Sequence, residues 1–529
     1  MNDPGSPPWL AALERPEAYP HPVQGVQRVE THISWVLLTG EHAYKIKKPV
    51  DLGFLDYSTL EKRHFYCREE LRLNRRLAAP LYLGLSRITG PVERACMDGE
   101  GEVLEYAVHM RQFPVGDQFD RLLAGGRLEE RHLEALAEDI ARFHRTLAEA
   151  APPDSDFGTP EVVIRPMREN FQHLEGTDPR LPALRRWTEA AFRRLRPRLE
   201  ERRRQGWIRE CHGDLHLGNI VLWEGRPLPF DGIEFDPYLR WIDVQSELAF
   251  LTMDLEDRGR RDLAFLTLNT YLAHSGDYAG LALLPFYQVY RAMVRAKVSH
   301  IRLTQGGLDD GERARLERDF HQYLALAEGY TRPPRPVLIL TSGVSGSGKS
   351  WLARRLAMAG GAIHLRSDVE RKRLFGLPPL ARTHAAPDTH IYTPGATAAT
   401  YRRLRELAET VLAAGYPVIV DATFLTRDRR APFLDLAERL GVPCHILHAT
   451  APRSVLEERV RRRAEQGRDP SEADVAILER QLQKVEPWAA DEKERVVTVD
   501  TRDPVDVTAL ARGLHLRPGG AVDPPAPPC

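Results

Sequence analysis

Two segments of the chain carry residue types and spacings that suit the transfer of a phosphate group. The first is His212-Gly-Asp214-Leu-His216-Leu-Gly-Asn219, in which a carboxylate stands five residues before an amide. In such a loop Asp214 can take the proton of an acceptor hydroxyl, and Asn219 can bind Mg²⁺. Asp231, after the next apolar run, is the second predicted metal ligand, and His212 is expected to brace the loop.

This segment leaves alternatives open. His212 and His216 have the H-x-x-x-H spacing of a zinc chelate, but two glycines place the pair in a loop rather than on a helix. An inert loop is the other alternative. Glu234 and Asp236, which follow Asp231, are either extra site carboxylates or local turn residues.

The second segment, Gly343-Val-Ser-Gly-Ser-Gly348-Lys349-Ser350, matches G-x-x-x-x-G-K-[ST] in full. It follows a strand-like run and opens a helical pattern. Glycines let backbone N–H groups curl around phosphate oxygens, and the helix N-terminus adds positive potential. Lys349 is expected to reach the outer phosphates, and Ser350 to ligate Mg²⁺. The predicted phosphate-binding residues are Gly343, Ser345, Gly346, Ser347, Gly348, Lys349 and Ser350.

Charged residues follow the next strands in this half. Arg366 and Asp368 come at the carboxyl end of the second strand, the end that faces the ligand in an open α/β sheet. Asp368 is the predicted base, and Asp421, after the third strand, is a predicted metal ligand. A helical run adds Arg459, Arg461, Arg462 and Arg463. We favour Arg463 as a catalytic residue that neutralises developing charge; a solvated basic face is the alternative.

The C-terminal half alternates strand-like and helix-like segments, which predicts a parallel sheet with helices on both faces. Ser471 is expected to cap one of these helices, with Asp474 three residues on. The five predicted strands are Val337–Thr341, Ala362–Leu365, Pro417–Val420, Pro443–His448 and Val496–Val499.

The N-terminal half opens with SWVLLTG and AYKIKKPV, which predict a β-hairpin. Ser58 is expected to cap a helix that runs to about Leu77, and VLEYAVHMRQFP predicts a further strand. From Leu128 onward the apolar spacing is mainly helical. A small β-rich lobe followed by a larger α-rich lobe is the expected order.

The C-terminal motifs GVSGSGKS, LRSDVERKRL and VIVDATFLTRDRR resemble those of P-loop kinases of the polynucleotide kinase, zeta-toxin and gluconate kinase type. The resemblance covers most of residues 336–500. It implies phosphoryl transfer from ATP to a hydroxyl, with Asp368 as the base.

HGDLHLGN resembles the aminoglycoside phosphotransferase and choline kinase branch of the protein-kinase-like fold. That family implies a strand lysine, for which Lys45 is chosen and Lys47 stays possible. It also implies a helix glutamate, with Glu70 chosen and Glu69 the alternative. Asp243 resembles the family's structural aspartate. The sequence departs from the family in lacking G-x-G-x-x-G and in reading D-G-I-E-F-D where kinases have D-F-G.

The two halves in this order resemble a bacterial fusion of an aminoglycoside phosphotransferase-like domain with a P-loop ATP-binding domain. The expected fold is an α+β protein-kinase-like domain followed by an α/β P-loop domain with a parallel sheet. The predicted boundaries are a leader at 1–20, the two domains at 21–332 and 333–512, and a disordered tail at 513–529.

Composition limits the function classes. The net charge of −1 excludes a generally basic nucleic-acid coat, though not a local basic patch. The five cysteines form no C-x-x-C pair, which fits a reducing cytosol. The N-terminus has no signal-peptide pattern, and no apolar run is long enough to span a membrane. We therefore expect a cytoplasmic protein.

The leading hypothesis is a bifunctional phosphotransferase that uses ATP and Mg²⁺. Each domain would phosphorylate a hydroxyl of a small-molecule substrate. One alternative is a nucleotide-gated regulatory protein with a pseudokinase N-terminal domain. The other is a nucleic-acid end kinase, but the arginines of AFRRLRPRLEERRR are interleaved with glutamates, so nucleic acid is not the expected partner. The oligomeric state is left open.

Overall fold

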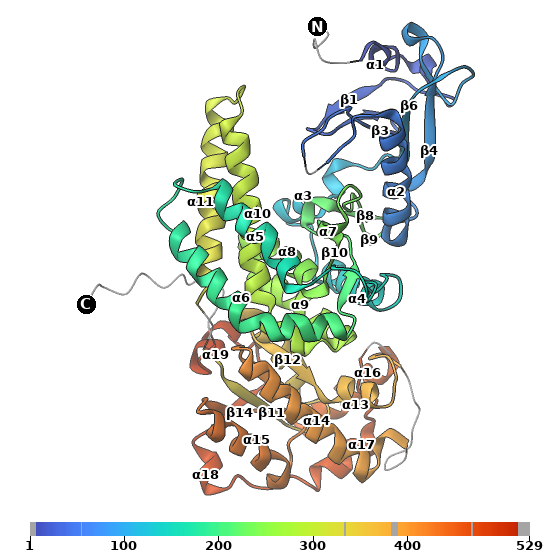
Figure 1. The fold of residues 1–529 in the computed structure, drawn as a ribbon. Helices are drawn as coiled ribbons and strands as arrows, with labels where there is room; N and C mark the ends of the chain where they lie inside the picture. Colours follow the sequence, from blue (N-terminus) through green and yellow to red (C-terminus); the bar gives the residue numbers. More distant parts are fainter. Residues whose placement is uncertain (1–6, 54, 333–334, 382–389, 467–468, 517–529) are drawn as a thin grey trace. The chain divides into compact units, whose positions relative to one another are not determined.

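The structure is a computed structural model of the 529-residue chain, and it describes residues 7–53, 55–332, 335–381, 390–466 and 469–516 (Figure 1). The chain forms two compact units, one made of residues 1–166 and 194–251, the other of 167–193 and 252–529. The predicted boundary at residue 333 lies outside the described residues and stays a prediction. Of the predicted tail, only residues 513–516 are described.

The first unit contains a six-stranded antiparallel sheet with the order β1-β2-β3-β6-β4-β5. The predicted hairpin is confirmed as β2 and β3, with Ser34 opposite Lys47. Side chains alternate across β3, so that Ala43, Lys45 and Lys47 share one face while Tyr44 and Ile46 pack into the core on the other. The strands are β1 (Gln27–Glu30), β2 (Ser34–Leu38), β3 (His42–Lys47), β4 (Tyr82–Thr89), β5 (Cys96–Met97) and β6 (Val103–Arg111).

Helix α2 (Leu60–Ala78) packs against the lysine-bearing face of this sheet. Cys67, Leu71 and Ala78 form a core with strand residues. The expected cap at Ser58 is wrong, because the helix starts one residue later and Thr59 accepts from the N–H of Lys62. The Ser58 hydroxyl donates to Asp56 instead.

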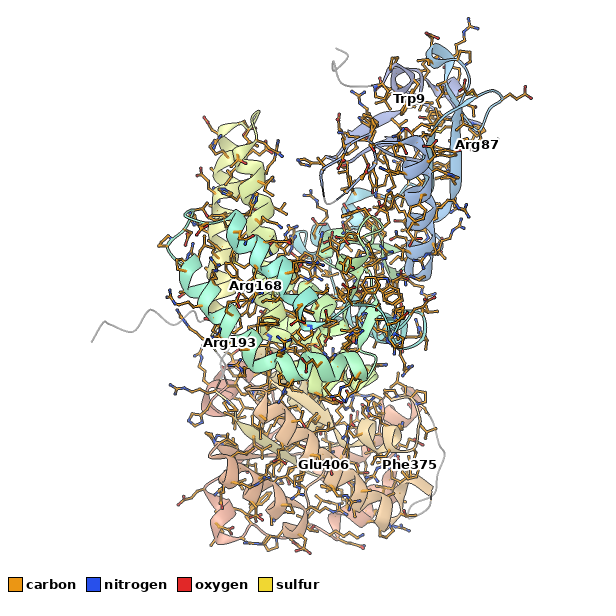
Figure 2. The ribbon with its side chains drawn as sticks, viewed as in Figure 1. Trp9, Arg87, Arg168, Arg193, Phe375 and Glu406 are labelled. Atoms are coloured by element: carbon orange, nitrogen blue, oxygen red, sulfur yellow. The ribbon has the colours of Figure 1, made fainter. Side chains whose placement is uncertain are left out.

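The opposite face of the sheet is covered by the start of the chain. Helix α1 (Pro8–Ala12) carries Trp9 (Figure 2). Its ring makes an edge-to-face contact with Trp35 of β2, with ring centroids 6.0 Å apart. Leu10 and Leu13 are fully buried in the same core. The described part of the predicted leader therefore packs into the first unit.

After the sheet, helices and two small two-stranded antiparallel sheets follow, as the predicted change from β-rich to α-rich structure requires. The helices are α3 (Phe119–Ala124), α4 (Glu130–Thr146), α5 (Pro160–His173), α6 (Leu181–Arg204), α7 (Pro237–Arg240) and α8 (Val244–Asp257). Strand β7 (Ile208–Glu210) pairs with β10 (Trp241–Asp243), and β8 (Ile220–Trp223) with β9 (Arg226–Pro229). The turns between these short strands carry the predicted site residues.

Besides parts of α5, α6 and α8, the second unit contains helices α9 (Arg261–Ser275), α10 (Leu284–Thr304) and α11 (Asp310–Tyr330). The predicted parallel sheet follows, and it is confirmed as five strands in the order β12-β13-β11-β14-β15, all parallel. They are β11 (Leu338–Ser342), β12 (Ile363–Arg366), β13 (Val418–Asp421), β14 (Cys444–Thr450) and β15 (Val496–Asp500). Because β11 lies between β13 and β14, its carboxyl end is a topological switch point, where such sheets bind ligands.

Helices cover this sheet. Helix α12 (Lys349–Gly360) and α19 (Val507–Gly513) pack on residues of β11, β13, β14 and β15, while α14 (Pro394–Ala413) packs on β12 and β13. The remaining helices are α13 (Ser367–Leu374), α15 (Arg427–Leu440), α16 (Arg453–Gln466), α17 (Val475–Leu482) and α18 (Ala490–Lys493). The expected cap at Ser471 is wrong, because Asp474 caps α17 by accepting from Ile477 N–H at 2.8 Å.

Helix α9 is attached to the edge strand β12. Asn269 donates to the carbonyl of Ala362 at 2.9 Å and accepts from the N–H of His364 at 2.7 Å. The carboxamide thus occupies backbone groups that an edge strand otherwise exposes. The buried Tyr278 donates to Glu370 of α13 at 3.3 Å. None of the helices in the described part of the chain combines the length and apolarity needed to cross a membrane.

Candidate functional sites

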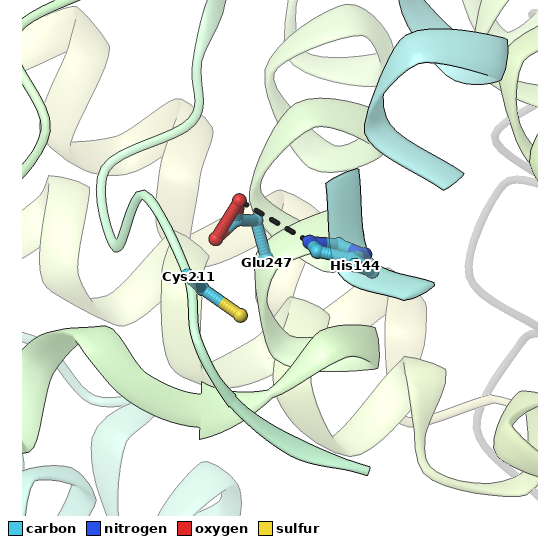
Figure 3. Close-up of side chains that lie close together, drawn as sticks. All are labelled: His144, Cys211 and Glu247. Atoms are coloured by element: carbon cyan, nitrogen blue, oxygen red, sulfur yellow. Dashed lines mark hydrogen bonds and ion pairs between the residues drawn. The ribbon is translucent and has the colours of Figure 1, made fainter. Parts of the chain in front are cut away.

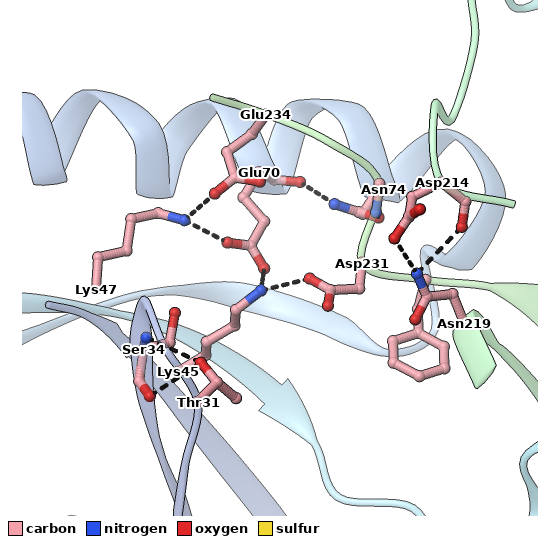
Figure 4. A network of polar contacts seen from close by, with 12 residues as sticks. Thr31, Ser34, Lys45, Lys47, Glu70, Asn74, Asp214, Asn219, Asp231 and Glu234 are labelled. Carbon is pink, nitrogen blue, oxygen red and sulfur yellow. Dashed lines mark hydrogen bonds and ion pairs between the residues drawn. The ribbon is translucent and has the colours of Figure 1, made fainter. Parts of the chain in front are cut away.

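The lysine-bearing face of the first sheet meets α2 at an ion-pair centre. Lys45 Nζ donates to Glu70 Oε1 at 2.9 Å, and the same ammonium pairs with the carboxylate of Asp231 (Figure 4). The side chain of Lys45 is 14% exposed and that of Asp231 is 45% exposed. A strand, a helix and the segment after β9 therefore converge on one partly open point.

A second, buried lysine belongs to this centre. Lys47, only 1% exposed, donates to Glu70 Oε2 at 2.7 Å and pairs with Glu234. The Tyr57 hydroxyl donates to the same Glu234 carboxylate. Because these partners enclose Lys47, only Lys45 keeps access to solvent. The geometry supports Lys45 over Lys47 as the lysine that meets phosphate, and that role stays a prediction.

Burial and ion pairing shift the pKa values of these charged groups in opposite directions. Burial raises the pKa of Glu70, but the two ammonium groups lower it to about 2. Burial lowers the pKa of Lys45, but the carboxylates of Asp231 and Glu70 raise it well above its usual value. Glu70 and Lys45 are therefore both charged at neutral pH, which a lysine that binds phosphate requires.

The predicted catalytic loop lies between β7 and β8. Asn219 donates to the carbonyl of Asp214 at 3.1 Å and to its carboxylate at 3.0 Å. The backbone carbonyl of Asn219 accepts from Phe230, the residue before Asp231, at 2.9 Å. These bonds place the ends of the loop beside the predicted metal segment. The side-chain carbonyl of Asn219 accepts no hydrogen bond from the described residues and is available to a cation.

His212 braces this loop through both ring nitrogens. Its Nε2 donates to the carbonyl of Phe230 at 2.9 Å, and its Nδ1 accepts from the N–H of Asp214 at 3.3 Å. This pattern requires the neutral ring, and burial lowers the pKa of His212. Because both nitrogens are occupied, the geometry argues against a zinc chelate formed with His216.

Glu247 of α8 holds the start of the same loop. Its carboxylate accepts from the N–H groups of His212 and Gly213 at 2.8 and 3.2 Å and contacts His144 Nε2 at 3.4 Å (Figure 3). Burial raises the pKa of Glu247, but hydrogen bonds from His144 and Gly213 lower it to about 2. With Cys211, His144 and Glu247 offer three potential metal-ligand atoms within 4.8 Å of one another. Burial raises the pKa of the Cys211 thiol well above its usual value, and the Glu247 carboxylate is already bonded to two backbone N–H groups, so the contacts present support the loop.

The backbone of Asp231 is strained. Its φ of 62° lies in the left-handed region, which is uncommon for a residue other than glycine. The Asp231 N–H donates to the Tyr82 hydroxyl at 3.0 Å, and the N–H of Gly232 donates to Asn74 of α2 at 2.8 Å. Strained residues held by tertiary bonds concentrate at functional sites.

The other acidic candidates have local partners. Glu69 pairs with two arginines, so Glu70 rather than Glu69 faces the lysines. Glu234 is paired with the buried lysine, and Asp236 caps α7 by accepting a backbone N–H at 2.8 Å. Asp243 accepts two hydrogen bonds from a buried arginine of α6, at 2.6 and 2.8 Å. Neither Glu234 nor Asp236 is therefore an extra open carboxylate of the site.

A tight turn joins β1 to β2 where protein kinases have a glycine-rich loop. Thr31 N–H donates to the carbonyl of Ser34 at 2.9 Å, and Ser34 N–H donates to Thr31 Oγ1 at 3.0 Å (Figure 4). The threonine side chain thus closes the turn between these two strands.

The second candidate site is the loop between β11 and α12. Gly343, Gly346 and Gly348 have φ values of 145°, 83° and 82°. A Cβ on Gly346 would lie 2.5 Å from the carbonyl oxygen of Leu456, and one on Gly343 would lie 2.7 Å from that of Ala449. Only glycine fits these positions without a shift of the backbone.

This loop has polar groups without partners. The N–H groups of Gly346 and Gly348 donate to none of the described residues, and the buried Ser347 hydroxyl has no hydrogen-bond partner. The N–H of Ser345 is already bonded, at 2.7 Å, to the side chain of Gln481. Unpaired donors at a helix N-terminus are what an anionic ligand would satisfy.

Charged residues converge beside this loop. Burial lowers the pKa of Lys349, and the nearby Asp421 and Asp368 oppose that shift. Asp421, 3% exposed, contacts His364 Nε2 at 3.1 Å; burial raises its pKa, but His364 and Arg366 lower it below its usual range. Asp368 accepts no hydrogen bond from the described residues. Lys349, Asp368 and Asp421 are therefore grouped at the carboxyl edge of the sheet.

The arginines of α16 make different contacts. Arg459 donates to Thr501 Oγ1 and to its carbonyl, both at 2.8 Å, and so braces the loop after β15. Arg461 pairs with Glu457 on the helix surface. Arg463 bonds the carbonyl of Ala473 at 2.9 Å and is close enough to Lys349 to lower its pKa. Of the arginines with described contacts in this run, Arg463 is the one whose charge lowers the pKa of Lys349.

A cavity of about 280 Å³ borders the same loop at Gly343, Val344 and Ser347. Its walls are mainly apolar, with Trp488 among them, and Lys349, Asp368 and Asp421 do not line it. The cavity is therefore separate from the group of charged residues.

Both sites offer oxygen ligands that suit a hard cation. In the first, they are the open carboxylate of Asp231 and the free side-chain carbonyl of Asn219. In the second, they are the Ser350 hydroxyl and the ionised carboxylate of Asp421. Carboxylate, amide and hydroxyl oxygens are the donors that Mg²⁺ prefers.

Sequence reasoning missed several contributors. His364 faces Asp421, Asp469 pairs with Arg366 at 3.1 Å, and Gln481 bonds the phosphate-binding loop. None belongs to a motif, and their partners lie between 57 and 136 residues away along the chain. Only the polar side chain of His364 within an apolar strand was a local signal.

Two family models match the chain, one in each half. The profile of the Phosphotransferase enzyme family matches residues 67–284, and that of an AAA domain matches residues 338–488. The chain therefore joins a segment that matches a phosphotransferase family to a segment that matches an AAA domain with a P-loop motif.

Relatives of nearly full length show the particular family. Uncharacterized proteins from Mycobacterium tuberculosis and Mycobacterium bovis are 32% identical to this chain over 427 residues, which cover 79% of this chain and 81% of theirs. The chain belongs to the same family as these mycobacterial proteins.

Solved structures match each half. A choline/ethanolamine kinase family protein from Mesorhizobium loti is 12% identical, over 61% of this chain and 98% of its own, with a TM-score of 0.34. A structure described as a putative kinase, from Chloroflexus aurantiacus, is 24% identical over 34% of this chain and 99% of its own, with a TM-score of 0.29.

Proposed function

We propose that the chain is a bifunctional phosphotransferase in which each domain transfers the γ-phosphate of ATP to a hydroxyl of a small molecule. The observation that carries this proposal is that each domain groups a lysine, a carboxylate for the acceptor proton and oxygen ligands for a cation. A domain retained only for binding would not need all three.

In the kinase-like domain, Lys45 would bind the nucleotide phosphates, with Glu70 fixing its position. Asp214 would take the proton of the acceptor hydroxyl as that oxygen bonds to the γ-phosphorus and the bond to the ADP oxygen breaks. Asn219 and Asp231 would hold Mg²⁺, which neutralises phosphate charge when bound. The hydrogen bond from Asn219 to Asp214 would orient the base.

In the P-loop domain, the loop Gly343–Ser350 would cradle the phosphates through its unpaired N–H groups, and Lys349 would reach the outer ones. Asp368 would take the acceptor proton, and Ser350 and Asp421 would hold Mg²⁺. Arg463, which already acts on Lys349, would offset charge on the transferred group.

Binding stoichiometry tests the two-site part of the proposal. Titration of the full chain with a non-hydrolysable ATP analogue and Mg²⁺ should give two sites per chain. K349A and K45M should each remove a different one, and R439A, a surface variant on α15, should keep both. One site in the parent chain, or loss of both sites in a single variant, contradicts two independent nucleotide sites.

A further inference from the structure

A groove of about 540 Å³ runs along α14 and α15 in the P-loop domain. Its walls hold four cationic side chains, Arg402, Arg405, Arg429 and Lys484, and one carboxylate, Asp428. This volume is in the range of small-molecule sites. The excess of positive charge in it contrasts with the net charge of −1 of the whole chain.

The cations of this groove make no ion pair with the described residues, unlike other arginines on the same helices. Outside the groove, Arg427 pairs with Asp491 at 2.8 Å and Arg439 pairs with Glu409 at 3.0 Å. Within the groove, no ion pair to a described residue is made by Arg402, Arg405, Arg429 or Lys484. Unpaired guanidinium groups gathered in one concave surface suit a planar or tetrahedral anion, which they can bind bidentately.

The groove is connected to the element that carries Asp421. The hydroxyl of Tyr401, one of its lining residues, lies 3.3 Å from that of Thr423, two residues beyond Asp421. The guanidinium of Arg429 lies 4.9 Å from the centre of the same tyrosine ring. One wall is therefore joined to the carboxyl end of β13.

The other wall is connected to the helix that carries Asp368. Arg371, one turn further along α13, donates to the hydroxyl of Thr397 at 3.2 Å and lies 5.2 Å from the ring of Tyr392. Both Thr397 and Tyr392 line the groove. The groove is thus attached on both sides to elements that hold the predicted base and the predicted metal ligand.

We propose that this groove binds the phosphate acceptor of the P-loop domain, and that the acceptor is a small hydroxylated molecule with a phosphate or carboxylate group. The proposal rests on the proposed transfer function of this domain. Arg402 and Arg405 bind the anionic group, while the hydroxyl is presented to Asp368. A neutral acceptor gives these cations nothing to bind.

The first test measures anion binding without turnover. Inorganic phosphate is titrated by calorimetry into the full chain carrying K349A, so that the phosphate-binding loop is impaired. Adding R402A and R405A should weaken one saturable binding event at least tenfold, while adding R439A should leave it unchanged. If no binding event depends on Arg402 and Arg405, the proposal is overturned, whether or not the domain transfers phosphate.

The second test identifies the acceptor. A metabolite extract is separated by anion exchange, and each fraction is incubated with the full chain and γ-labelled ATP. The labelled product that is lost in D368N should arise from an anionic fraction, and R402A/R405A should raise KM at least tenfold with little change in kcat. A neutral acceptor, or an oligonucleotide whose binding weakens steeply with salt, overturns the proposal. Phosphate binding that depends on both arginines, without any product that depends on Asp368, instead removes the transfer function of this domain.

Discussion

Replacing each of the two lysines of β3 by methionine should have opposite effects on stability and on nucleotide binding. Lys47 is 1% exposed and neutralises Glu70 and Glu234, which are 0% and 4% exposed. K47M leaves these carboxylates buried with less compensating charge, and breaking such a buried pair costs roughly 3–5 kcal/mol. For a unit of about 220 residues this corresponds to a fall in Tm of roughly 6–20 °C.

Lys45 should behave differently. In K45M, Glu70 keeps its bond to Lys47, and Asp231 is 45% exposed and can be hydrated, so the cost in stability is about 1 kcal/mol. Nucleotide binding at this site should nevertheless be lost. K48M serves as the matched control, since Lys48 pairs with the exposed Glu30 and should change neither property by much.

Urea unfolding followed by tryptophan fluorescence measures the stability of each variant, and hydrogen exchange in peptides from β3 and α2 locates the effect. The double variant K47M/E234Q should recover at least half of the lost stability, because it removes one uncompensated carboxylate. The reasoning is refuted if K47M unfolds at the same urea concentration as the parent chain while K45M is strongly destabilised.

Three further predictions concern pH, the phosphate-binding loop and the helices before it. The pKa of Glu247 is lowered to about 2 on folding, so its stabilisation of roughly 3 kcal/mol is complete above pH 4.5 and lost as the pH falls towards 2; E247Q should flatten acid unfolding followed by circular dichroism. G346A, with a Cβ 2.5 Å from the Leu456 carbonyl and φ of 83°, should weaken ATP binding by the P-loop domain at least tenfold in calorimetry, with the kinase-like site unaffected. A chain that begins at residue 333 lacks Asn269 and Tyr278 and so leaves β12 and Glu370 uncovered. In urea unfolding, its P-loop domain should be less stable by roughly 2–6 kcal/mol than the same domain in the full chain. Equal stability of the two would show that these contacts contribute nothing.

Much of the fold follows from local patterns. The five parallel strands were predicted because each is a short apolar run between helical segments, and the hairpin of β2 and β3 because two strand-like runs flank a turn. The candidate site residues were found where chemistry needs neighbours in sequence, as in the loop from Asp214 to Asn219 and in Gly343–Ser350.

The remainder depends on contacts that no local pattern records. Ser58 and Thr59 are both competent caps, and the choice is made by Asp56, which takes the Ser58 hydroxyl. Lys45 and Lys47 share one strand face, and only the enclosure of Lys47 by Glu234, 187 residues later, distinguishes them. Sequence spacing cannot reveal such partners, because they meet only after the chain folds.

The most direct measurement of the central claim is transfer of label from γ-labelled ATP to a metabolite extract by four full-length chains: the parent, D214N, D368N and D214N/D368N. The account predicts two sets of products, one lost in each single variant and both lost in the double variant, with each chain folded by circular dichroism. If the double variant keeps the products of the parent chain, or if one single variant removes every product, the claim of two independent phosphotransfer sites is contradicted.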